Sequence, residues 1–144
     1  MEYFLMKKLV LLIASVVCIG FYSNAQTASV TCKLPGTYDY VNVDYYESDG
    51  HLAVSNQSGM KLTQLHITVK CTITWEQKDY SADNYGGYKT LTKTVTVCDK
   101  NFYDIAPNQT TRLTDGVKSR KDIDIRNNTA KYEYTVTVGN PICK

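Results

Sequence analysis

The alternation of apolar and polar side chains over residues 65–75 constrains the fold of this chain more than any other feature. Successive side chains of a β-strand point to opposite faces, so strict alternation predicts a strand with one dry and one solvated face. Its many β-branched residues favour a strand over a helix. We therefore expect a central strand of the core here. The apolar positions are Leu65, Ile67, Val69, Cys71, Ile73 and Trp75.

Shorter stretches of the same kind occur along the rest of the chain, separated by turn sequences such as Pro35-Gly36. No segment keeps a helical periodicity over three turns. Short alternating strands without helices predict an all-β fold, an antiparallel β-sandwich of about seven or eight strands. The further strands are expected at residues 29–34, 38–46, 51–55, 88–98 and 131–138, with shorter candidates at 110–113 and 122–125.

Residues 1–25 have the pattern of a signal peptide. Lys7 and Lys8 precede an apolar run that is too short to span a membrane comfortably, and small residues follow it. Cleavage before Gln26 leaves one domain, residues 26–144, with no membrane span. Lipidation at Cys18 is disfavoured, because Val17 stands where a lipoprotein signal needs a small residue. We expect export to the periplasm, the cell surface or the medium.

Four cysteines remain in the mature domain. An even number in an exported chain implies two disulfides. A zinc site would need closely spaced cysteines such as Cys-x-x-Cys, and the sequence contains no such pair. Residues 32 and 71 have apolar parity, whereas residue 98 falls on the threonine side of its strand. This favours the pairs 32–71 and 98–143, and the pairs 32–143 and 71–98 stay open. The expected disulfide residues are Cys32, Cys71, Cys98 and Cys143.

The charge of the mature domain is nearly balanced. Without Glu2, Lys7 and Lys8 it carries 14 basic and 13 acidic residues, a net charge of +1. A nucleic-acid-binding domain usually carries a strong basic excess. We therefore expect neither nucleic acid nor an anionic membrane as a partner.

Two turn sequences carry a family resemblance. Asn-Gln-Ser-Gly at residues 56–59 and Asp-Ile-Ala-Pro-Asn-Gln at residues 104–109 resemble those of secreted immunoglobulin-like bacterial domains, most nearly the FxLYD type. The resemblance covers about residues 52–113. Trp75-Glu76 and Asn108 depart from the family pattern. The resemblance implies an immunoglobulin-like sandwich and, at most, an extracytoplasmic binding or structural role.

The connection at residues 79–88 has the composition of a binding loop, with three tyrosines, two aspartates, an asparagine and two glycines. Tyrosine supplies rigid amphipathic contact area, while asparagine and glycine supply adaptable geometry. The more ordinary interpretation of the same composition is a mobile hairpin whose tyrosines lie flat on the sheet. The candidate binding residues are Tyr80, Asn84, Tyr85 and Tyr88.

Catalytic and metal-binding patterns are weak. The chain has two histidines, His51 and His66, and no Gly-x-Ser-x-Gly motif. The acidic residues near Tyr45 lack the spacing of a calcium loop. We therefore expect no enzyme, no metal and no cofactor.

The leading hypothesis is a non-catalytic secreted binding module for an unknown protein or glycan. The alternative is a structural or adhesin-type assembly subunit that acts by strand pairing. A cryptic hydrolase is less favoured. The sequence does not fix the oligomeric state.

Overall fold

The computed structural model describes residues 27–81, 83, 85–139 and 142–143, the last two by their backbone alone. The predicted signal peptide and its cleavage site lie outside the described residues. The described elements, in chain order, are β1 (Ala28–Lys33), β2 (Tyr40–Tyr46), β3 (His51–Asn56), β4 (Leu62–Asp79), β5 (Gly87–Ile105), β6 (Gln109–Leu113), the 3₁₀ helix η1 (Arg120–Ile123), β7 (Lys131–Val138) and β8 (Ile142–Cys143).

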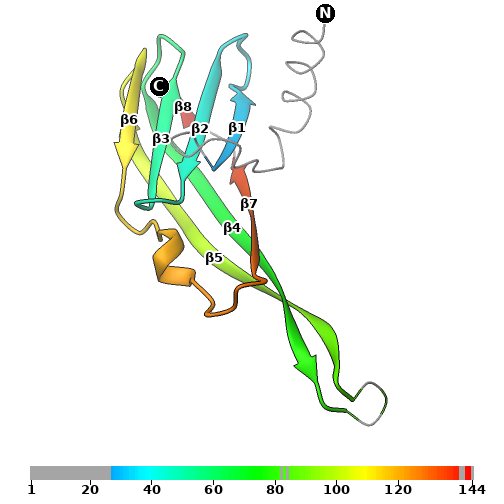
Figure 1. Cartoon of the computed structure of the whole chain (residues 1–144). Coiled ribbons are helices and arrows are strands. Elements are labelled where there is room, and N and C mark those ends of the chain that lie inside the picture. Colours follow the sequence, from blue (N-terminus) through cyan, green and yellow to red (C-terminus); the bar gives the residue numbers. More distant parts are fainter. Residues whose placement is uncertain (1–26, 82, 84, 140–141, 144) are drawn as a thin grey trace, which may run out of the picture.

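The strands form two antiparallel sheets that pack against each other, as in a β-sandwich (Figure 1). One sheet has the order β1-β2-β3-β6, and the other has the order β5-β4-β7, with β8 also paired to β4. The predicted all-β sandwich is confirmed at this level. β4 lies between β5 and β7, so the prediction of a central strand over residues 65–75 is confirmed as well.

The core forms where the inner faces of the two sheets meet. The ring of Tyr45 from β2 lies against that of Tyr134 from β7, with 5.1 Å between centroids. Trp75, at the end of the β4 stripe, is only partly buried. The stripe that alternation predicted is otherwise fully buried at Leu65, Ile67, Val69, Cys71 and Ile73.

A β-bulge in β5 changes the direction in which Cys98 points. Val69 pairs with Cys98 but Lys70 pairs with Thr96, so one extra residue stands in β5. Val97 and Cys98 are consequently both buried, although they are consecutive. The prediction that Cys98 lies on the polar face with the threonines is therefore wrong.

No disulfide joins the cysteine side chains that the structure describes. Cys32, Cys71 and Cys98 are free thiols, which excludes both expected connectivities. Cys32 lies near the end of the edge strand β1, partly exposed, and its thiol donates to the Lys33 carbonyl at 3.6 Å. Cys71 lies in the middle of the other sheet, between Val95 and Tyr134. Of the Cys143 side chain, the structure describes nothing.

The predicted short strand at residues 122–125 is also wrong, because part of it belongs to the helix η1. The Ser119 backbone N–H donates to the Asp122 carboxylate at 2.6 Å, as in a helix capping box. This bond holds the pKa of Asp122 below its ordinary value. The local capping interaction therefore prevails over the weak strand pattern.

β4 and β5 continue beyond the sandwich as a two-stranded arm (Figure 1). The pairing of β7 with β4 ends at Thr74 and Lys131, whereas β4 and β5 stay paired as far as Asp79 and Gly87. We call residues 76–90 the arm. No helix in the described part of the chain is long and apolar enough to span a membrane.

Candidate functional site

Two of the predicted binding tyrosines form a pair at the tip of the arm. The rings of Tyr80 and Tyr85 meet edge to face, with 5.8 Å between centroids. Their side chains are 65% and 77% exposed, so most of this aromatic surface is open to solvent. Lys78 Nζ lies 5.9 Å from the centre of the Tyr80 ring, within the range of a cation–π contact.

Tyr88 lies one step back from the tip, on β5 opposite Lys78, and is 65% exposed. The structure thus places three of the four predicted residues on the last part of the arm. The fourth, Asn84, lies outside the described residues. The alternative, tyrosines lying flat on the sheet, does not fit side chains this exposed.

Asp79 accepts two hydrogen bonds from described residues of the tip. The Gly86 N–H donates to the Asp79 carbonyl at 2.9 Å, and the Ser81 N–H donates to the Asp79 side chain at 2.9 Å. Gly86 has φ +85°, a conformation that costs glycine little and other residues much more. These bonds therefore join Asp79 and Gly86, the two ends of the segment that carries the tyrosine pair.

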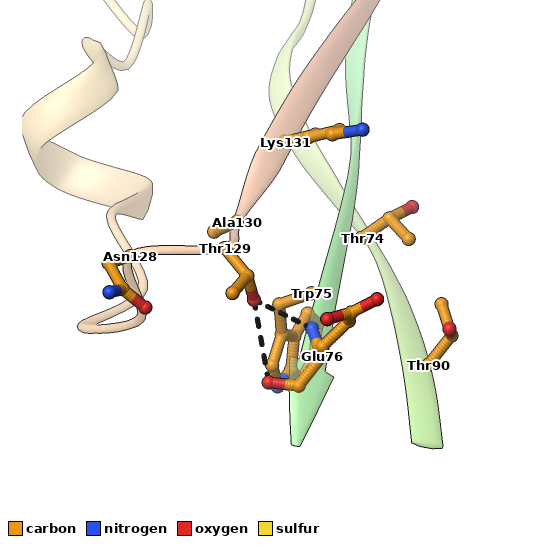
Figure 2. Close-up of a pocket in the computed structure, with 8 residues that line it drawn as sticks. All are labelled: Thr74, Trp75, Glu76, Thr90, Asn128, Thr129, Ala130 and Lys131. Carbon is orange, nitrogen blue, oxygen red and sulfur yellow. Dashed lines mark hydrogen bonds between the residues drawn. The ribbon is translucent and has the colours of Figure 1, made fainter. Parts of the chain in front are cut away.

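A cavity of about 500 Å³, which we call the base cavity, lies where the arm leaves the sandwich (Figure 2). Residues of β4 and β5 form one wall, and the loop that leads into β7 forms the other. The sequence analysis did not single out this site. Its lining residues are Thr74, Trp75, Glu76, Thr90, Asn128, Thr129, Ala130 and Lys131.

The loop before β7 is fixed to the edge of β4 by side chains. The Glu76 N–H donates to Thr129 Oγ1 at 2.8 Å, and Asn127 Nδ2 donates to the Glu76 carbonyl at 2.9 Å. The Asn127 side chain in turn accepts the Thr129 N–H at 2.8 Å. These bonds replace those that β7 would have made at this point, and Figure 2 shows the Thr129 contacts with Glu76 as dashed lines.

Each histidine contacts a carboxylate. His66 lies between Asn101 and Asp99, at 2.8 and 2.7 Å. His51 contacts Asp49 at 2.5 Å, and this bond lowers the pKa of Asp49 below its ordinary value. Within the described residues, neither imidazole is hydrogen-bonded to a serine or a cysteine.

The described thiols are poorly suited to catalysis. Burial raises the pKa of Cys71 and that of Cys98 to about 11, and it also raises the pKa of Cys32. A thiol is nucleophilic only as its thiolate, so these groups are largely unreactive at neutral pH. Among residues that the structure describes, no group of three or more His, Cys, Asp and Glu could hold a metal ion.

Comparison with known proteins finds no family model that matches the chain and no similar curated protein. The fold and the two candidate sites therefore define the class of this protein by themselves. It is a two-sheet β-protein with an aromatic arm and a cavity at the base of that arm.

Proposed function

We propose that this protein is an exported, non-catalytic binding module that recognises a protein or a glycan through the tyrosines of its arm. The observation that carries the proposal is the exposure of Tyr80, Tyr85 and Tyr88 on an arm that extends beyond the sandwich. The proposal includes the removal of residues 1–25 on export and an immunoglobulin-like type of sandwich as scaffold.

The arm has the physical properties of a contact surface. A tyrosine ring buries a large apolar area in a complex while its hydroxyl keeps a hydrogen-bond partner, and it loses little side-chain entropy. The Tyr80–Tyr85 contact and the bonds of Asp79 to Ser81 and Gly86 order these residues before a partner arrives. Pre-ordering of this kind reduces the entropy lost on binding.

A screen of the purified protein against a glycan array and against secreted proteins tests the proposal. We expect a ligand whose affinity falls at least tenfold in the variant Tyr80→Ala/Tyr85→Ala, because these residues supply the exposed aromatic contact. The melting temperature should stay nearly unchanged, because neither ring belongs to the core.

Tyr103→Ala is the matched control, since Tyr103 is 62% exposed but lies on the opposite end of β5. It should leave binding unchanged. Equal binding by the arm variant and the unaltered protein would contradict the proposal, as would the absence of any ligand.

A second candidate function, assembly by strand pairing, is supported by the open edge of β5. Among the described strands β5 pairs with β4 alone, and in the described part of the chain no backbone group bonds to the outer side of residues 89–96. The first such bond runs from the Lys118 N–H to the Val97 carbonyl at 3.1 Å. An unpaired edge of this length is a template for another strand.

A further inference from the structure

The base cavity has the size of a small-ligand site. Its volume of about 500 Å³ lies within the range of about 300–1,000 Å³ that is usual for such sites. It is also much larger than the cavities of about 150 Å³ that hold a benzene molecule in a protein core. The cavity is therefore large enough for one or two rings of an oligomeric ligand.

Two residues of opposite charge line this cavity without forming an ion pair with each other. In the part of the chain that the structure describes, neither the Glu76 carboxylate nor the Lys131 ammonium group forms an ion pair or a side-chain hydrogen bond. The carboxylate would repel an anion, and the ammonium group would repel a cation. The pair therefore favours a ligand without net charge that carries both donors and acceptors.

Neutral polar side chains add further hydrogen-bond donors and acceptors to the lining of the cavity. The Thr74 and Thr90 hydroxyls and the Asn128 amide line it from both sides, and each can donate as well as accept. Their side chains likewise form no hydrogen bond within the described residues. Sugar hydroxyls, which also donate and accept, match such a mixed set of groups.

Trp75 and Ala130 give the cavity an apolar wall. On a strand, Trp75 points to the face opposite to that of Thr74 and Glu76. One ligand can contact both faces only where the strand edge is not covered by another strand. β7 begins at Lys131, so beyond Thr74 only the side chains of Asn127 and Thr129 reach the edge of β4. The C–H face of a sugar ring could then pack on Trp75 while its hydroxyls reach the polar side chains.

The walls of the cavity are held in position without a ligand. Asn127 and Thr129 attach the loop to the backbone of Glu76 by the hydrogen bonds described above. These bonds use only backbone groups of Glu76, so its carboxylate stays available. Sites whose supporting contacts are already formed bind with a smaller loss of entropy.

We propose that the base cavity binds a neutral sugar ring, as part of a glycan, with Glu76 and Lys131 contacting its hydroxyls and Trp75 packing on its apolar face. This site is distinct from the tyrosine tip of the arm. It therefore does not depend on the arm being a binding surface.

The single tryptophan of the chain, Trp75, makes a direct test possible. The purified protein is titrated with glucose, galactose, mannose, N-acetylglucosamine and their disaccharides, and both tryptophan fluorescence and calorimetric heat are recorded. We expect a saturable fluorescence change with at least one sugar. Glu76→Gln and Lys131→Gln should each weaken its binding about tenfold, because each removes a charged hydrogen-bonding group.

Matched variants and a second class of ligand complete the test. Glu133→Gln and Lys93→Gln remove the same charges from exposed positions outside the cavity and should leave binding unchanged. Tyr85→Ala should also bind normally, which separates this site from the proposed function of the arm. The proposal fails if no sugar binds, if both cavity variants bind normally, or if the zwitterion dialanine binds in place of the sugars.

Discussion

At the scale of single residues, one inserted position in β5 decides the environment of a cysteine. Alternation along residues 88–98 places Cys98 with the exposed threonines, but the bulge beside Val97 turns it into the core. A pattern of period two cannot indicate where an extra residue breaks the register. The same limit explains why the expected face of each cysteine on its strand could not predict whether its thiol is free or bonded.

The buried thiols should make the protein less stable in alkali. Unfolding restores an ordinary thiol pKa near 9, whereas the folded protein holds the pKa of Cys71 and Cys98 at about 11. Between these values the unfolded chain releases protons that the folded one keeps, so the free energy of unfolding falls as the pH rises. Below pH 9 the thiols contribute no pH dependence. Urea unfolding measured between pH 7 and pH 11 gives the slope.

Cys98→Val isolates the thiol contribution from that of tyrosines and lysines, which also titrate in alkali. This variant keeps a buried side chain of similar size and should show a shallower fall in stability over the same pH range. An identical slope in the variant and the unaltered protein would contradict the assignment of Cys98 as a buried free thiol.

At the scale of elements, the regular strands follow from the sequence and the connections between them do not. The stripe from Leu65 to Ile73 is buried as alternation predicts, because one face of β4 has nowhere else to place its apolar side chains. The helix η1 begins with the hydrogen bond between Ser119 and Asp122, a local capping interaction that alternation of apolar and polar residues does not indicate.

Of the two candidate sites, only the arm could be predicted from the sequence. The tyrosines of the arm are close in sequence, so composition alone could indicate them. The base cavity joins Trp75 and Glu76 to Asn128 and Lys131, which are more than fifty positions later in the chain. It exists because β7 starts at Lys131 and leaves this edge of β4 without a paired strand, a register that no sequence signal specified.

The segment that leads from β6 to β7 joins both sheets. Its Lys118 carbonyl accepts the Tyr45 hydroxyl at 2.8 Å, and its Arg120 N–H donates to the Glu47 carbonyl at 2.8 Å. It also passes close to Gly50, where an added Cβ would stand 2.7 Å from the Ser119 nitrogen. The turn between β2 and β3 therefore needs a glycine for space as well as for conformation.

Gly50→Ala should accordingly destabilise the protein more than Gly36→Ala. Both glycines have nearly the same positive φ, +73° and +72°, so the conformational cost of about 1–2 kcal/mol is shared. Only at Gly50 does the new methyl group meet backbone atoms, whereas nothing lies within 4 Å at Gly36. Chemical denaturation of the two variants measures the difference. Equal losses would show that the segment at Ser119 does not pack on this turn.

At the scale of the whole molecule, one long hairpin serves two purposes. Near the sandwich, β4 and β5 supply much of the core, and beyond β7 the same strands form the arm. A two-stranded ribbon is weak alone, so its continuity with a packed sheet is what supports it. Because the arm contributes little to the core, its surface can vary without loss of the fold.

The open edge of β5 puts the molecule at risk of unwanted strand pairing, and two lysines counter this risk. Lys89 and Lys93 are exposed on residues 89–96 of β5, which have no outer backbone partner among the residues that the structure describes. Charged side chains on an edge disfavour pairing with a second copy, because the charges would be brought together and desolvated. We therefore expect the protein to be monomeric in solution, which favours the binding module over the assembly subunit.

The double variant Lys89→Thr/Lys93→Thr tests whether these lysines prevent strand pairing at the edge of β5. Threonine keeps the strand propensity and removes both charges, so the variant should associate as its concentration rises. Light scattering after size-exclusion chromatography gives the mass at several concentrations. Lys61→Thr, which removes an exposed charge outside β5, is the control and should stay monomeric. If the unaltered protein already associates and the double variant does not, β5 is an assembly edge and the lysines attract their partner strand.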